Sequence, residues 1–254
     1  VQLLIAGTGD DQLLGFGVIV GGEGGIFLVQ TVQAGADLFF LAADLGSDGH
    51  GVAGFCKVYL FADEFTNRQE AELGLTFARL LIALGYAVEV PRHRESGRAA
   101  ISKGYLKLAK KLATENVSLL GDIISADTPL VGIEPSCILS FRDEYPDLVP
   151  AGMRERARGL GRNCLLFDEF IAAEIKCGNI SPDAFKKDEV EIFLHGHCHQ
   201  KALVGIEKSA SMLRLLKGAK VNVIPSGCCG MAGSFGYEKE HYKTSIAIGE
   251  MILF

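Results

Sequence analysis

IFLHGHCHQK, residues 192–201, and VYLFADEFTN, residues 58–67, are the two stretches that decide the fold. Each begins with a short apolar run, which is typical of a buried strand, and passes directly into polar side chains. The two stretches align without a gap, and Glu95-Ser96-Gly97 then matches Cys228-Cys229-Gly230 with a slip of one residue. The chain therefore contains an internal repeat, and its two halves are expected to share one fold.

Strand-like and helix-like patterns alternate from Lys57 onward. Short apolar runs predict strands at 58–61, 87–90, 129–133, 192–194 and 221–225. Apolar residues at helical spacing predict helices between them, with faces at Leu73, Phe77, Leu80, Leu81 and Leu84, at Ile101, Tyr105, Leu108 and Leu112, and at Tyr242, Ile246, Gly249 and Leu253. Residues 151–178 are expected to be helical. This order predicts an α/β fold of two pseudo-repeated β-α-β halves with mostly parallel sheets, and functional groups at the carboxyl ends of the strands.

The composition changes abruptly at Lys57. Residues 1–56 hold 13 of the 31 glycines and no Lys or Arg, whereas all 25 basic residues come later, so a boundary is expected there. The glycine-rich runs in this segment do not fit the phosphate-binding G-x-G-x-x-G pattern, and we interpret them as loose connections between short strands. The predicted divisions are a glycine-rich segment of unassigned structure, a first half, a helical connection and a second half, at 1–56, 57–150, 151–190 and 191–254.

Bulk properties exclude several classes of function. A formal charge of -6 and a pI near 5.6 argue against a nucleic-acid partner, because such binding depends on clustered Lys and Arg. The longest apolar stretch, 26–43, is interrupted by Gln30, Gln33 and Asp37, so no transmembrane helix is expected. The opening VQLLIAG carries no targeting pattern, which makes the cytoplasm the expected compartment. Cysteines in that reducing compartment are usually free thiols or metal ligands.

The adjacent cysteines Cys228 and Cys229 are the strongest chemical feature of the sequence. They follow an apolar run and precede Gly230 and an expected helix, so both thiols should lie on a turn at a helix N-terminus, which favours thiolates. Two neighbouring sulfurs suit an iron–sulfur cluster, and Gly230 lets the backbone approach it. Cys198, at an equivalent strand end, is the expected third ligand, and Cys137 is the expected fourth. The remaining cysteines are expected bystanders: Cys56, and, as small helical core residues, Cys164 and Cys177.

Three histidines bracket Cys198 and allow a second interpretation. On an extended strand, His195, His197 and His199 would share one face, with the thiol on the other. Alternate histidines also occur in hydrolytic zinc sites, although no carboxylate stands close by in the sequence. Iron–sulfur, zinc and an empty thiol cluster therefore remain open, and for each histidine a hydrogen-bonding role is favoured over metal ligation.

The strings LHGHCHQKAL and IPSGCCGMAGSFGYEKEHY, with GIEPSCILSFRDEYPDL and ESGRAAISKGYLKLAK, resemble the cysteine-rich CCG-domain pair of FAD-linked oxidases over about residues 57–254. Related domains occur in glycolate and D-lactate oxidase iron–sulfur proteins, anaerobic glycerol-3-phosphate dehydrogenase and heterodisulfide reductase. The resemblance implies a 4Fe-4S type cluster that receives electrons from FAD on a partner subunit or domain and passes them on. It also implies a ferredoxin-like iron–sulfur segment as a partner, and a cytoplasmic location or a peripheral one at the inner membrane face.

The chain departs from the family pattern in ways that limit this inference. Glu64 stands where the second half has Cys198, and Glu95-Ser96 stands where it has Cys228-Cys229, so one cluster is the expected maximum. The ferredoxin spacing C-x-x-C-x-x-C and a recognisable flavin domain are both absent from the sequence. We therefore expect a fragment or component, not a complete enzyme: the iron–sulfur electron-transfer domain of an FAD-linked 2-hydroxy-acid oxidoreductase, of the D-lactate or glycolate type. The alternatives are thiol–disulfide chemistry, a zinc hydrolase using residues 195–199, and a non-catalytic scaffold with a decayed site.

Overall fold

The computed structural model describes residues 20–22, 25–27, 56–185, 187, 189–233 and 235–253. These residues form two compact units: the first unit contains 56–170, and the second unit contains 171–253 with the two short segments 20–22 and 25–27. Those segments are the antiparallel strands β1 (Val20–Gly22) and β2 (Gly25–Phe27). The other glycine-rich connections expected in residues 1–55 lie outside the described residues.

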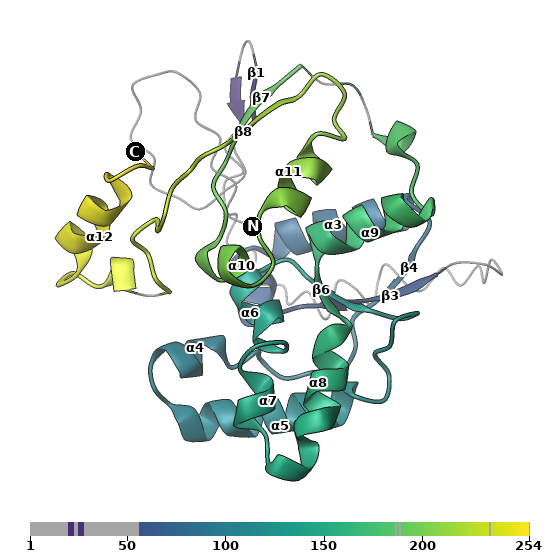
Figure 1. Ribbon diagram of the computed structural model, residues 1–254, viewed down its shortest axis with the longest axis vertical. Helices are drawn as coiled ribbons and strands as arrows, with labels where there is room; N and C mark the ends of the chain where they lie inside the picture. Colours follow the sequence, from purple (N-terminus) through teal and green to yellow (C-terminus); the bar gives the residue numbers. More distant parts are fainter. Residues whose placement is uncertain are drawn as a thin grey trace. The chain divides into compact units, whose positions relative to one another are not determined.

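The first unit is built on a four-stranded sheet in which all strands run parallel, in the order β4-β3-β5-β6 (Figure 1). The strands are β3 (Lys57–Phe61), β4 (Ala87–Glu89), β5 (Leu130–Gly132) and β6 (Cys164–Leu166). The two central strands are almost entirely buried. Continuous apolar runs form such strands because helices cover a parallel sheet on both faces.

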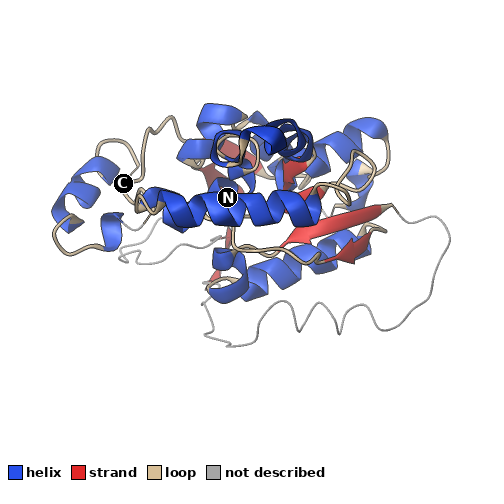
Figure 2. Ribbon diagram, turned by 90° about the horizontal axis from the view of Figure 1, so that it is seen from below, coloured by secondary structure: helices blue, strands red, loops and turns tan. Residues whose placement is uncertain are grey.

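Helices cover both faces of this sheet (Figure 2). The helices are α2 (Glu64–Arg68), α3 (Ala71–Ala83), α4 (Arg98–Ser102), α5 (Leu106–Leu120), α6 (Pro135–Ser140), α7 (Tyr145–Leu148), the 3-10 turn η1 (Ala151–Met153), α8 (Arg154–Arg162) and the start of α9 (Phe167–Cys177), which continues into the second unit from residue 171. Helix α3 meets the start of α9 through the rings of Phe77 and Phe167, whose centroids are 5.5 Å apart. Helices α5, α7 and α8 pack together on the opposite face (Figure 1).

An aromatic group joins the sheet of the first unit to this second helical layer. The ring of Phe141 lies edge-on to Phe61 at 5.1 Å and against Tyr145 at 4.4 Å, and all three side chains are fully buried. Burial of each such ring is worth about 1.5–3 kcal/mol. The core of the unit thus lies directly beneath the carboxyl end of β3, where the polar residues 63 and 64 follow.

The second unit repeats this plan with fewer strands. Strands β7 (Glu191–Leu194) and β8 (Lys220–Val223) pair in parallel, and the other elements are the 3-10 turn η2 (Pro182–Ala184), α10 (Cys198–Leu203), α11 (Glu207–Leu213), the 3-10 turn η3 (Phe235–Tyr237) and α12 (Tyr242–Gly249). Its core is formed by Val190, Ile192, Leu194 and Ala210. The order β7-α10-α11-β8 matches β3-α2-α3-β4, which confirms the α/β repeat expected from the sequence.

The helix face predicted at Ile101, Tyr105, Leu108 and Leu112 is wrong, and of the face predicted at residues 242–253 only Gly249 is buried. Tyr105 is 67% exposed and Leu108 is 49% exposed, whereas α5 buries Ala109, Ala113, Asn116, Val117 and Leu120. The predicted face joined residues on both sides of Gly104. This glycine has a φ of +75° and separates the end of α4 from the start of α5, so the two parts do not share one helix. In α12, Tyr242 is 54% exposed and the buried positions are Ser245 and Gly249.

The helical stretch predicted for residues 151–178 is interrupted by strand β6. This three-residue strand pairs with β5, and Cys164 is fully buried in it and not in a helix. Three apolar residues between two helices are too few to show the period of a strand. The edge of the sheet could therefore not be distinguished from a helix in the sequence.

Candidate metal centre

Cys228 and Cys229 lie half-buried on a tight turn after β8. The backbone N–H of Gly230 donates a hydrogen bond to the Cys228 sulfur at 3.3 Å. Gly230 has a φ of +88°, and a Cβ at this position would lie 2.1 Å from the backbone oxygen of Ser245 in α12. Only glycine combines this left-handed conformation with so close an approach.

The helix expected directly after this turn is absent from the described residues. Gly233 also has a positive φ, +68°, and Ala232 has a φ of +41°, so the chain continues through turns until η3. Among the described residues, Cys228 and Cys229 therefore do not themselves precede a helix N-terminus directly. It is Cys198 that begins a helix, as the first residue of α10.

The extended arrangement predicted for the three histidines is also wrong, because α10 begins among them. His197 is the N-cap residue, and its Nδ1 accepts a hydrogen bond from the backbone N–H of His199 at 3.2 Å. In the repeat, Asp63 caps α2 in the same way and accepts from the N–H groups of Phe65 and Thr66. Asp is a preferred N-cap residue, so the repeat contained the signal for a helix start at residue 197.

The three thiols of the second unit are brought together. Cys198 is exposed, and its thiol is hydrogen-bonded to that of Cys228. Desolvation and then the negative charges of Cys228 and Cys229 raise the pKa of Cys198, while the charge of Lys201 opposes this. Three soft donors that repel one another as thiolates form a donor set that fits a thiophilic metal, because a cation relieves that repulsion.

His195 supports the turn from the end of β7. Its ring is buried, and Nδ1 lies 2.5 Å from the hydroxyl of Ser226, two residues before Cys228. Burial, followed by the charges of Lys201 and His197, lowers the pKa of His195 to about 4, so the ring is neutral at pH 7. Neither Ser226 nor Lys201 was predicted from the sequence. Lys201 could have been recognised, because it follows Cys198 by three residues and these two residues therefore share one helical face.

The first unit replaces thiols by a hydrogen-bonded group at the repeat-related positions. The carboxylate of Glu64 accepts from the Ser96 backbone N–H at 2.8 Å and from the Ser96 hydroxyl at 2.7 Å. The same hydroxyl lies 3.2 Å from the Cys137 sulfur. Gly97 has a φ of +80°, as Gly230 has +88°, so the two turns share their backbone bend.

Cys137 lies in the first unit. It is on the first turn of α6, whereas its place in the sequence predicted a position just past a strand end. Its backbone N–H donates to the side chain of the N-cap residue Glu134 at 2.6 Å, and its thiol is fully buried. Burial, then the negative charges of Glu134, Asp63 and Glu64, raises the pKa of Cys137 well above its usual range. The other three cysteines of the proposed cluster belong to the second unit.

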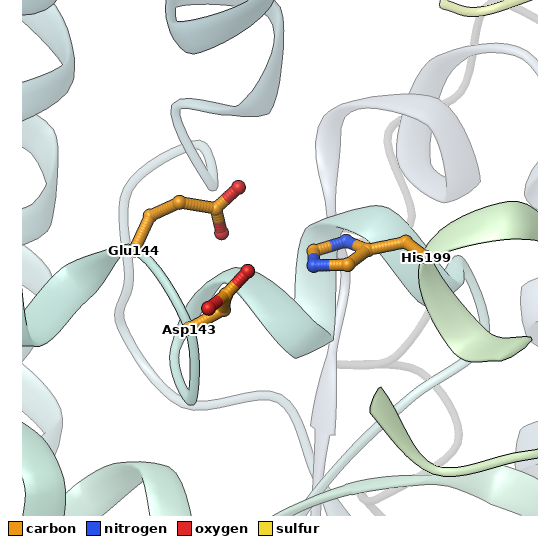
Figure 3. A group of neighbouring side chains, drawn as sticks. All are labelled: Asp143, Glu144 and His199. Carbon is orange, nitrogen blue, oxygen red and sulfur yellow. The ribbon is translucent and has the colours of Figure 1, made fainter. Parts of the chain in front are cut away.

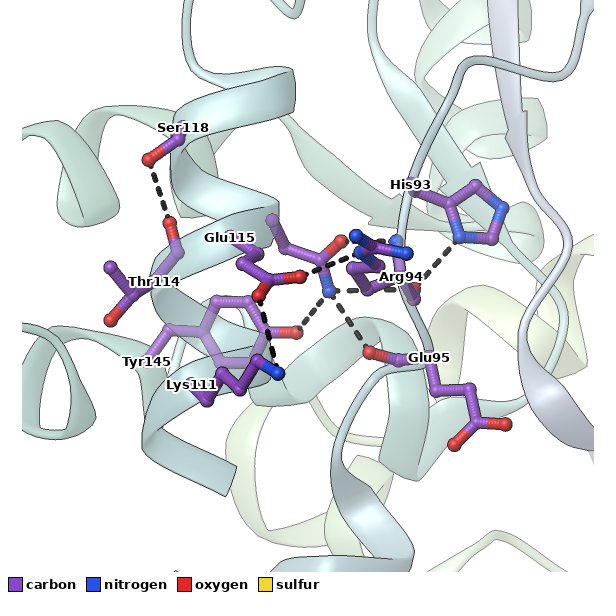
Figure 4. Close-up of polar contacts among 9 residues, drawn as sticks. His93, Arg94, Glu95, Lys111, Thr114, Glu115, Ser118 and Tyr145 are labelled. Carbon is purple, nitrogen blue, oxygen red and sulfur yellow. Dashed lines mark hydrogen bonds and ion pairs between the residues drawn. The ribbon is translucent and has the colours of Figure 1, made fainter. Parts of the chain in front are cut away.

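The turn of the first unit is anchored to helix α5 by an ion pair between Arg94 and Glu115, 2.6 Å, and by hydrogen bonds of uncharged groups (Figure 4). The side chain of Asn116 accepts from the backbone N–H of Arg94 at 2.7 Å and donates to the carbonyl of Glu95 at 3.0 Å. It also donates to the phenol oxygen of Tyr145 at 2.9 Å, and that phenol donates to the carbonyl of Ser96 at 2.8 Å. Buried polar groups are thus matched along the whole turn, which holds its conformation.

Two carboxylates, Asp143 and Glu144, precede α7 in the first unit (Figure 3). Glu144 forms an ion pair with Arg98 of α4, so it ties α7 to the helix that begins at the turn. His199, drawn in the same figure, is on α10 of the second unit.

The cysteines predicted to be bystanders differ in their surroundings. Cys164 is buried and its thiol donates to the backbone oxygen of Leu160 at 3.3 Å, as expected of a core cysteine. Cys56 and Cys177 are exposed, so Cys177 is not the core residue that the helical pattern indicated.

In each unit a turn follows a parallel strand, and the thiols that this turn carries in the second unit are replaced in the first. The structure thus defines the protein as a pair of cysteine-rich α/β domains. The chain is 31% identical over 199 residues to the D-2-hydroxyglutarate dehydrogenase of Pantoea ananatis and 30% identical over 198 residues to that of Escherichia coli. It is 27% identical over 195 residues to one subunit of the anaerobic glycerol-3-phosphate dehydrogenase of Escherichia coli. Each match covers 76% of this chain, and the relatives are of the kind expected from the resemblance to the CCG-domain family.

The chain spans only part of these relatives: 18% of the two D-2-hydroxyglutarate dehydrogenases and 48% of the glycerol-3-phosphate dehydrogenase subunit. No protein-family model matches the chain, and no solved structure matches it significantly. None of the helices in the described residues is long and apolar enough to cross a membrane.

Proposed function

We propose that the chain holds one iron–sulfur cluster of the 4Fe-4S type and passes electrons within a flavin-linked 2-hydroxy-acid dehydrogenase. The observation that carries this proposal is the gathering of Cys198, Cys228 and Cys229 at the carboxyl ends of β7 and β8. Thiolates are the ligands of such clusters, and neighbouring cysteines can bind different irons of one centre. When bound, the cluster supplies a site that takes up and releases a single electron.

The protein's own groups prepare this site. The turn before Gly230 carries two successive cysteines, and the Gly230 N–H group donates to the Cys228 sulfur at 3.3 Å. Hydrogen bonds of this kind stabilise negative charge on a ligand sulfur and adjust the reduction potential of a cluster. Cys198 adds a third sulfur from α10.

Cys137 is the proposed fourth ligand, and His199 is the alternative within this chain. Cys137 now engages the Ser96 hydroxyl at 3.2 Å, so metal binding by this thiol would require that contact to open.

The physiological partner is proposed from the relatives. Several of them are dehydrogenases of D-2-hydroxyglutarate, a 2-hydroxy acid, and another is one subunit of an anaerobic glycerol-3-phosphate dehydrogenase. We propose that a flavin domain or subunit oxidises the substrate and transfers electrons to this chain, and that a ferredoxin-like segment continues the path. A cytoplasmic location, or a peripheral one at the inner membrane face through these partners, is part of the same proposal.

Cysteine variants of the full chain test the ligand assignment. After anaerobic reconstitution with iron and sulfide, Cys229→Ser is expected to lose its iron while keeping the far-UV circular dichroism of the parent, because a hydroxyl is a poor ligand for iron but similar in volume. Cys177→Ser, which changes an exposed thiol of the same unit, is the matched control and should retain iron.

Unchanged iron content in Cys229→Ser would contradict the proposed ligand set. Loss of iron in Cys137→Ser would support Cys137 as the fourth ligand, and full retention would exclude it. Stoichiometric zinc without iron in the parent chain would favour the zinc alternative based on residues 195–199.

A further inference from the structure

Lys201 connects the helix that carries Cys198 to the turn that carries the other two thiols. Its ammonium group donates a hydrogen bond to the backbone oxygen of Ser226 at 2.7 Å and another to that of Gly227. These two carbonyls immediately precede Cys228. A cation bound to two successive carbonyls fixes both the distance and the orientation of the turn relative to α10.

The local backbone is shaped to let this lysine reach the turn. A Cβ on Gly196 would lie 3.0 Å from Cγ of Lys201 and 2.1 Å from Cδ1 of Ile206. The stem of Lys201 therefore lies directly over the glycine backbone at the end of β7. The hydrogen bond between His195 and the Ser226 hydroxyl, 2.5 Å, joins the same two segments a second time.

The repeat provides an internal comparison. At the position of Lys201 the first unit has Asn67, and its turn is held by Asn116 and Tyr145, from α5 and α7. Neither of these groups carries a charge, and Arg68, the cation at the end of the helix that bears Glu64, binds the exposed carboxylate of Glu95 at 2.9 Å and not a backbone carbonyl of the turn. Among the described residues, a cation thus binds the backbone carbonyls of the turn in the unit with three thiols, whereas neutral groups bind them in the unit where the thiols are replaced.

We propose that Lys201 is a positioning residue for the metal centre, which holds the thiol turn against α10 and balances the negative charge of the bound thiolates. This inference rests on the proposed function and adds a named residue to it. Lys201 is not itself a ligand, because an ammonium group has no lone pair. Its effect is expected through the geometry of the sulfurs and through the electric field at the cluster.

The test compares Lys201→Met, Lys201→Arg and Lys220→Met in the full chain, reconstituted anaerobically with iron and sulfide. Methionine keeps the length of the stem and removes charge and donors, whereas arginine keeps the charge. Lys220 is an exposed lysine of the same unit, paired with Glu191, and serves as the control. The readouts are iron release to a chelator, the reduction potential of the cluster and the far-UV circular dichroism of each variant.

Lys201→Met is expected to release iron roughly 10- to 100-fold faster than the parent, as is usual when a supporting contact of a metal site is lost. Its reduction potential should become more negative, because a neighbouring positive charge favours the reduced cluster. Lys201→Arg should restore the potential, and Lys220→Met should match the parent in both readouts.

The inference is overturned if Lys201→Met matches the parent in iron release and potential. It is also overturned if Lys201→Arg fails to restore the potential, since the charge would then have no part in the effect. If Lys201→Met does not fold, the reduction potentials of Lys201→Arg and Gly196→Ala are compared instead. Gly196→Ala displaces the Lys201 side chain without removing its charge. A potential that shifts in Gly196→Ala but not in Lys201→Arg supports the inference, and equal potentials overturn it. A parent chain that takes up no iron would instead refute the proposed function, and this inference with it.

Discussion

Substituting Gly230 with alanine is expected to destabilise the second unit and to weaken metal binding. Two costs add at this position. An alanine held at a φ of +88° is strained by about 1–2 kcal/mol, and its Cβ would meet the Ser245 backbone oxygen at 2.1 Å. A backbone oxygen cannot rotate away as a side chain can, so α12 must shift, at an overpacking cost of about 1–3 kcal/mol.

Gly205→Ala separates the two costs. Gly205 has a φ of +75°, but a Cβ there would have no atom within 4 Å, so this variant suffers the strain without the collision. We expect a loss of about 1–2 kcal/mol for Gly205→Ala and about 2–5 kcal/mol for Gly230→Ala. Urea unfolding followed by circular dichroism, suitable for a chain without tryptophan, should then differ between the variants by a midpoint shift on the order of 1 M.

Equal midpoints for the two variants would refute the close contact between the turn and α12. An unchanged midpoint in both would refute the left-handed backbone itself. Iron content gives a second readout. Of these two glycines, Gly230 alone donates a hydrogen bond to a thiol, so Gly230→Ala should lose iron and Gly205→Ala should keep it.

Three further predictions concern the first unit. Tyr145→Phe should cost about 1–3 kcal/mol in urea unfolding, because the buried Ser96 carbonyl and Asn116 amide each lose a partner; a loss below about 0.5 kcal/mol would contradict the anchoring of the turn. Burial, with the charge of Glu134, raises the pKa of Asp63 to about 7, so the folded state binds a proton that the unfolded state has released. Stability should therefore fall as the pH rises from about 4 to 7, at up to about 1.4 kcal/mol per pH unit, and Asp63→Asn should flatten this dependence; an equally steep profile in the variant would refute it. In native alkylation at pH 8 followed by mass spectrometry, Cys137 should react more than roughly tenfold more slowly than the exposed Cys177, and comparable rates would show that its thiol is not buried.

The sequence predicted the parallel α/β plan because the strands at 58–61 and 192–194 are continuous apolar runs, and such runs are characteristic of strands covered on both faces. The repeat between Glu95-Ser96-Gly97 and Cys228-Cys229-Gly230 was visible because a left-handed glycine is needed at the same bend in both units. Strand β6 could not be recognised, since its three residues are too few to distinguish the period of a strand from that of a helix.

The candidate site was predicted less completely than the fold. The grouping of Cys198 with Cys228 and Cys229 followed from strand ends in a parallel sheet, and the structure places these thiols together. The start of α10 at Cys198 was missed because histidine is not a usual N-cap residue, although Asp63 marks the equivalent position. Lys201 was missed because its contacts are with backbone carbonyls, which no side-chain pattern reveals.

The measurement that tests the central claim most directly is the metal content of the full chain after anaerobic purification. Iron, acid-labile sulfide and zinc would be quantified together, with electron paramagnetic resonance of the reduced sample. We predict about four irons and about four sulfides per chain, together with a signal from one reduced cluster. Stoichiometric zinc without iron, or a chain that holds neither metal even after reconstitution with iron and sulfide, would contradict the proposal.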